Sequence, residues 1–123
     1  MIEMRDVRQD SEDFVRRWFF DDNFDLIAWY AHDGALWGFQ LCYDKIAREK
    51  ALTWFSDRGL SHHLVDSGEQ CPWVNRNPML VEADGRSGMT QLLASFMVSD
   101  GGLPTELRKM VKQKIHEYGR RLT

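Results

Sequence analysis

The clearest pattern of hydrophobic and polar residues lies in residues 24–44, where two apolar, aromatic-rich runs flank Asp33 and Gly34. Alternation between the two faces of an extended chain is typical of β-strands. Both central positions of a two-residue hairpin turn need a positive φ, which Gly accepts freely and Asp tolerates. An Asp-Gly pair between such runs therefore favours this turn. The sequence therefore predicts a β-hairpin centred on Asp33-Gly34.

A two-residue turn also fixes which residues of the hairpin face each other. The expected pairs, from the turn outward, are His32 with Ala35, Tyr30 with Trp37, Trp29 with Gly38, Ile27 with Gln40 and Leu26 with Leu41. In this register we expect the indole of Trp29 to cover the bare backbone of Gly38, since an aromatic ring stabilises a glycine within a strand.

Further short apolar runs follow and precede this hairpin. Residues 50–55 and 60–65 read as two strands joined by a short turn that contains Gly59. Residues 2–7 are expected to add an edge strand, and the run at 79–81 is a candidate for one more. Four to six antiparallel strands are expected in total.

Residues 11–20 fit two patterns. Phe14, Val15, Trp18 and Phe19 recur at helical spacing behind Ser11 and two acidic residues, which favours a short helix. The same segment also alternates in the period of a strand. We expect the helix, with the strand as the alternative.

The pattern changes near residue 84, from short strands to helical periodicity. Ser87 is expected to cap a first helix, and Pro104 to begin a second that runs to about residue 122. The chain is therefore expected to form one domain, 1–123, that is strand-rich over 1–83 and helical over 86–122. The predicted class is α+β: an antiparallel β-meander with two C-terminal helices packed on one face.

The composition adds limits on location. The 123 residues include only two cysteines, too few for a disulfide-stapled secreted domain. The charged N-terminal stretch does not resemble a signal peptide, and no apolar stretch approaches the length of a membrane helix. We expect a cytoplasmic, bacterial-type protein with reduced thiols, no membrane association and no cofactor.

The charge is unevenly spread along the chain. Residues 1–30 hold four arginines against eight acidic residues, whereas residues 103–123 hold six basic against two acidic residues. The basic end is interpreted as the solvated surface of a helix, with an acidic partner as the alternative. The net charge of −3 argues against general nucleic-acid binding, which needs concentrated positive charge.

The stretch from Leu60 to Trp73 contains the residue types that bind zinc or support nucleophilic catalysis: His62, His63, Asp66 and Cys71. On a regular strand, however, neighbouring side chains point to opposite faces, so His62 and His63 cannot both reach one metal ion. No metal site is expected. A nucleophilic Cys71 with a histidine as base is kept as an alternative, because activation of a thiol depends on its surroundings.

Both faces of the predicted hairpin carry apolar side chains, and two helices cover only one of them. The less apolar face, with Ile27, Trp29 and Gln40, and the neighbouring Trp54 are therefore the candidate binding residues. We expect a non-catalytic binding or protein-interaction module that can self-associate through this face. Small-molecule binding in an aromatic pocket between sheet and helices is a further alternative.

Overall fold

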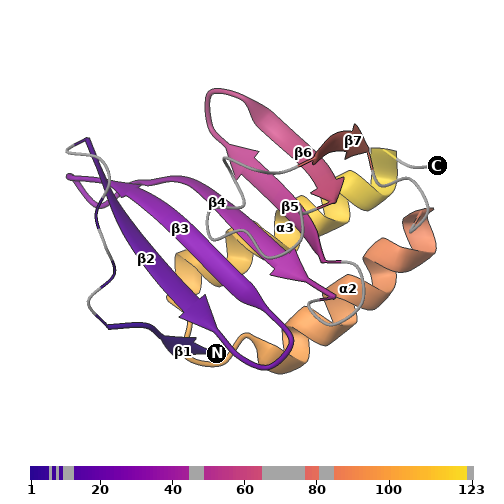
Figure 1. Cartoon of the computed structure of the whole chain (residues 1–123), viewed down its shortest axis with the longest axis horizontal. Helices are drawn as coiled ribbons and strands as arrows, with labels where there is room; N and C mark the ends of the chain where they lie inside the picture. Colours follow the sequence, from indigo (N-terminus) through magenta and orange to yellow (C-terminus); the bar gives the residue numbers. More distant parts are fainter. Residues whose placement is uncertain are drawn as a thin grey trace.

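The sheet and the two helices form two layers (Figure 1). The computed structural model describes residues 1–5, 7, 9, 13–44, 49–64, 77–80 and 85–121. Their strands are β1 (Ile2–Glu3), β2 (Phe14–Phe20), β3 (Asp25–Ala31), β4 (Leu36–Tyr43), β5 (Lys50–Phe55), β6 (Gly59–Leu64) and β7 (Asn77–Leu80). The helices are α2 (Gly85–Ser99) and α3 (Thr105–Arg121).

The strands pair in chain order, from β1 to β7, and every pairing is antiparallel. Both helices lie on the same face of the sheet (Figure 1). We call this face the first face and the opposite one the second face. The α+β meander with two C-terminal helices, predicted from the sequence, is confirmed.

The core lies between the first face and the helices. Phe19, Phe39 and Phe96 are fully buried in it, together with leucines of β3, β4 and β5. Helix α3 contributes one stripe at helical spacing: Leu107, Val111, Ile115 and Tyr118. Burial of each large apolar side chain stabilises the fold by about 1.5–3 kcal/mol, so this layer supplies most of the stabilisation.

The central hairpin forms as predicted, but its turn is longer. The Ala31 amide donates to the Ala35 carbonyl (2.8 Å) and the Gly34 amide to the Ala31 carbonyl (2.9 Å), which closes a loop of residues 32–34. Asp33 does not have a positive φ, since Asp44 is the only non-glycine residue with one in the described ranges. The expected two-residue turn is therefore not formed. Instead, the turn ends in a left-handed glycine, Gly34, with a φ of 92°.

This loop shifts the register by one residue, and a β-bulge restores it. Tyr30 lies opposite Leu36, but Trp29 lies opposite Gly38, so Trp37 is an extra residue on β4. The predicted pairs of Tyr30 with Trp37 and of His32 with Ala35 are therefore wrong. The predicted pairs beyond the bulge are confirmed: Trp29 with Gly38, Ile27 with Gln40 and Leu26 with Leu41.

The segment that precedes the hairpin is a strand, and the expected helix over residues 11–20 is wrong. β2 pairs with β3 along its whole length, from Phe14 opposite Ala31 to Phe20 opposite Asp25. Phe19 then faces the core while Trp18 faces the other side. Pairing with β3 satisfies the backbone hydrogen-bonding groups along one side of β2. These bonds outweigh the weak helical spacing of such a short segment.

The two helices are antiparallel neighbours that pack closely (Figure 1). A Cβ on Gly119 would lie 3.2 Å from Cβ of Met89, so this glycine marks a close approach of α3 to α2 and does not end the helix. Ser87 lies inside α2, which begins at Gly85, and so is not its cap. The Met1 ammonium donates to the carbonyl of Ser99 (2.9 Å), the last residue of α2, and to that of Gly101 (2.8 Å), just beyond the helix.

Candidate functional site

The two adjacent histidines point to opposite faces of β6. His62 is fully buried on the first face, where its Nε2 shares a hydrogen bond with the Tyr43 hydroxyl. Its ring also meets that of Tyr118 from α3 edge-on, at 5.1 Å between centroids. His63 lies opposite Ala51, one position further along, and the alternation of side chains places it on the second face. His62 is thus a core residue, closed off from solvent.

Asp66 and Cys71 lie outside the described residues, so the nucleophilic alternative stays a prediction. The described cysteine, Cys42, is buried on β4. Among the residues that the structure describes, no group of three or more His, Cys, Asp or Glu side chains gathers where it could hold a metal ion.

Trp54, a candidate binding residue, lies on the first face and is covered by helix α3. The Lys114 ammonium stands 5.0 Å from the centre of its ring. Trp54 therefore belongs to the rim of the core.

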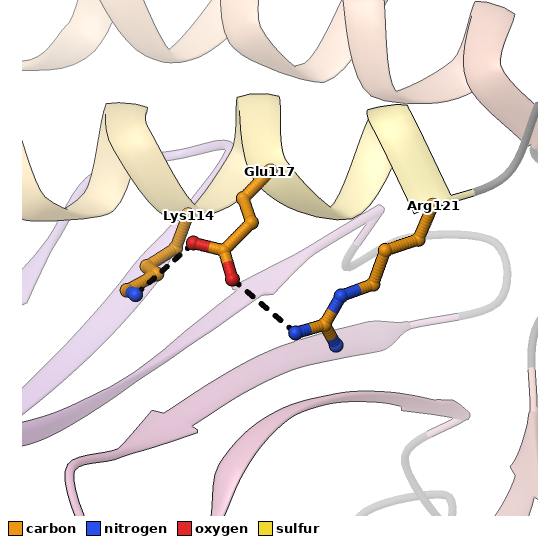
Figure 2. Close-up of polar contacts among 3 residues, drawn as sticks. All are labelled: Lys114, Glu117 and Arg121. Atoms are coloured by element: carbon orange, nitrogen blue, oxygen red, sulfur yellow. Dashed lines mark hydrogen bonds and ion pairs between the residues drawn. The ribbon is translucent and has the colours of Figure 1, made fainter.

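Part of the basic charge near the C-terminus is neutralised within α3. Figure 2 shows how Glu117 lies between Lys114 (3.1 Å) and Arg121 (3.2 Å) on this helix.

The second face carries an aromatic cluster that no described helix covers. Its buried members are Ile27, Trp29 and Phe55, with exposed fractions of 2%, 8% and 5%, and the partly buried Phe14, Trp18 and Trp37 pack against them. The extra residue of the bulge, Trp37, stacks on Phe14 with 4.0 Å between ring centroids. The bulge thus turns an additional indole toward this face.

The ring of Phe55 covers the backbone of Gly38. A Cβ at Gly38 would lie 2.2 Å from Cδ1 of Phe55, which is the cross-strand neighbour on β5. The Trp29 ring lies beside Phe55, at 5.2 Å between centroids. The predicted cover by an aromatic ring exists, and the ring nearest to Gly38 comes from β5.

A row of five residues, all with a polar side-chain group except Ile27, crosses the second face next to these aromatic residues. The strand register places Trp18, Ile27, Gln40, Thr53 and Ser61 side by side on five successive strands. We call this line the polar row. Gln40 is fully buried and Thr53 is 1% exposed, although both carry hydrogen-bonding groups.

Four buried atoms of the polar row have no hydrogen-bond partner among the described residues: Nε1 of Trp18, Oε1 and Nε2 of Gln40, and Oγ1 of Thr53. A buried polar group without a partner costs about 1–3 kcal/mol, and most buried polar groups in proteins are therefore bonded. Together these atoms offer donors and acceptors along one line.

Sequence reasoning identified Ile27, Trp29 and Gln40 on this face but missed Thr53 and Trp18. Thr53 sits between Ala51 and Phe55 at the alternating positions of β5, and this period-two signal places it beside Gln40 once the two strands are paired. Trp18 was hidden by the helical interpretation of its segment, which assigns it no place in the sheet.

Comparison with known proteins adds no relative to this picture. No family model matches the chain, and neither a curated protein nor a solved structure does. Neither α2 nor α3 has the length and the apolar character of a membrane-spanning helix.

Proposed function

We propose that this protein is a non-catalytic binding module in which a small, neutral, planar molecule enters the second face of the sheet and displaces the groups that cover the buried Gln40. The ligand class follows from the polar row: Gln40 offers an amide donor and acceptor, and Thr53 a hydroxyl, in an apolar setting. A planar molecule with a donor and an acceptor on one edge, such as a carboxamide or a heterocyclic base, complements these groups.

The aromatic cluster supports the planar part of this proposal. Trp29, Trp37 and Phe55 stand next to the polar row, and aromatic faces pack favourably on flat rings. Binding that satisfies Gln40 and Thr53 recovers the free energy that their burial costs, which favours the bound state. The single observation that carries the proposal is the carboxamide of Gln40, fully buried with neither atom bonded in the described structure.

Self-association through the second face stays a prediction of the sequence, to be measured by light scattering. It was expected because this face carries apolar side chains that the helices do not cover. That reason is weaker in the structure, because Ile27, Trp29 and Phe55 are at most 8% exposed within one chain. The proposed site of action is a reducing, bacterial-type cytoplasm, which fits a sequence with only two cysteines.

Titration with neutral planar fragments tests the proposal. Benzamide, nicotinamide and uracil carry a donor and an acceptor on one edge, whereas acetophenone matches the shape of benzamide but lacks the donor. We expect saturable shifts of the Trp29 and Trp37 indole signals in NMR spectra with the first three. Acetophenone should bind about tenfold more weakly than benzamide, because one buried hydrogen bond is then left unmade.

Matched variants locate the binding. Gln40→Met keeps the size of the side chain and removes both polar atoms, and it should abolish the shifts. Gln113→Met changes an exposed glutamine on α3 in the same way and should leave them intact. If none of the fragments binds to the wild-type protein, or if Gln40→Met binds benzamide as well as wild type, the proposal is wrong.

A further inference from the structure

One end of the polar row, on β2, carries a donor that the binding of a short ligand at Gln40 leaves unused. The Nε1 atom of Trp18 is buried and has no hydrogen-bond partner in the described structure. An indole nitrogen only donates, whereas the carboxamide of Gln40 both donates and accepts. A ligand that also brings an acceptor to Trp18 recovers the cost of this second buried group.

The sheet sets the spacing between Trp18 and Gln40. Trp18 lies opposite Ile27 and Ile27 lies opposite Gln40, so the two polar side chains stand two strands apart on the same face. Neighbouring strands lie about 4.8 Å apart, which separates the two Cα atoms by about 10 Å. An acceptor for Trp18 must therefore be remote from the ligand edge that meets Gln40.

The position between these two polar groups is apolar. Ile27 is 2% exposed and packs with Trp29 and Phe55, and Trp18 packs against the same group. A flat ring over Ile27 meets only aliphatic and aromatic side chains of this cluster, which suits the middle of a planar ligand. Along the row, the order of groups is thus a donor at Trp18, an apolar contact, and the donors and acceptors of Gln40 and Thr53.

We infer that the ligand of the second face is an elongated planar molecule with a carboxamide-like edge at one end and a hydrogen-bond acceptor at the other. Gln40 and Thr53 bind the first end, and the ring between the ends lies over Ile27. The Trp18 indole donates to the far acceptor, so Trp18 is a specificity-determining residue that selects ligands by their length and by this acceptor. The inference rests on the proposed function, because it extends the contact at Gln40.

Two carboxamides of the same shape test this inference. 4-Cyanobenzamide carries an acceptor opposite its carboxamide, whereas 4-ethynylbenzamide has a C–H group in place of the nitrile nitrogen. In NMR titrations the wild-type protein should bind 4-cyanobenzamide about tenfold more tightly, because only this compound satisfies the Trp18 donor. The signal of the Trp18 indole proton should also move further with 4-cyanobenzamide than with 4-ethynylbenzamide. Neither measurement needs a variant.

Variants of two tryptophans locate the preference. Trp18→Phe removes the indole N–H and keeps an aromatic ring, so it should weaken binding of 4-cyanobenzamide about tenfold and leave that of benzamide unchanged. Trp37→Phe removes an indole from the same face but outside the polar row, and should keep the preference for the nitrile.

The affinity for benzamide separates a failure of this inference from a failure of the proposed function. If wild type binds benzamide but binds 4-cyanobenzamide no more tightly than 4-ethynylbenzamide, the inference alone is wrong. The same conclusion follows if Trp18→Phe keeps the preference for the nitrile. If wild type binds neither benzamide nor 4-cyanobenzamide, the proposed function is wrong and the inference is overturned with it.

Discussion

At the scale of single residues, Gly38 is the position where two aromatic strands leave no room for a side chain. A Cβ there would lie 2.6 Å from the carbonyl oxygen of Trp54, a backbone atom, as well as against the ring of Phe55. Gly38→Ala should therefore lower the free energy of unfolding by about 3 kcal/mol, the upper range for overpacking. Urea denaturation measures this.

Gly101→Ala is the matched control, because a Cβ at Gly101 meets nothing within 4 Å. It should change the free energy of unfolding by less than about 0.5 kcal/mol. Equal effects of the two substitutions would show that contact with Phe55 and Trp54 is not the reason why glycine occupies position 38.

The buried pair of Tyr43 and His62 gives a second prediction at this scale. Tyr43→Phe removes the hydroxyl that bonds Nε2 of His62 and should cost about 1–3 kcal/mol of stability. In a His62→Leu background the same substitution should cost less than about 0.5 kcal/mol, because the partner is already absent. A double-mutant cycle by urea denaturation measures the difference. Equal costs in both backgrounds would mean that the two side chains are not coupled.

At the scale of elements, the ion pair of Glu3 and Arg17 ties β1 to β2. The hydrogen bonds from the Arg17 guanidinium lower the pKa of the Glu3 carboxyl. A carboxyl whose pKa is lower in the folded state stabilises the fold above its unfolded pKa, and this contribution is lost as the pH falls through the folded pKa. Both side chains are more than a third exposed, at 37% and 42%, so solvent screens the pair.

Glu3→Gln should therefore cost less than about 1 kcal/mol at neutral pH and nothing once the pH lies below both pKa values of Glu3. Unfolding by urea across the acid range measures the difference between variant and wild type. Asp57→Asn, in the exposed turn between β5 and β6, serves as the control for removal of one charge. A difference that stays constant down to strongly acidic pH would contradict the assignment to this ion pair.

Elements with strong local signals could be predicted from the sequence. β5 begins and ends where expected, at Lys50 and Phe55, and Gly59 has the left-handed φ (80°) expected of its turn. β2 could not be predicted, because its residues fit a helical and a strand pattern alike and only pairing with β3 decides between them. The bulge at Trp37 was equally hidden, since it arises from a loop one residue longer than the Asp-Gly pair suggests.

At the scale of the whole molecule, the two faces of one sheet have different roles. The first face builds the core with α2 and α3, and the sequence predicted this division from the order of strands and helices. The second face holds the aromatic cluster and the polar row. The sequence indicated Gln40 as a binding residue, but the polar row emerges only when five strands are set in register, which no local pattern reveals.

The proposed binding depends on Gln40 being a buried carboxamide without a hydrogen-bond partner among the described residues. The free energy of unfolding of ligand-free Gln40→Met, compared with wild type and with Gln113→Met, tests this most directly. We expect Gln40→Met to be more stable than wild type by about 1–3 kcal/mol, because an unsatisfied polar group is replaced by an apolar one of similar size. A Gln40→Met protein less stable than wild type would show that the folded chain itself bonds this carboxamide, and would contradict the account.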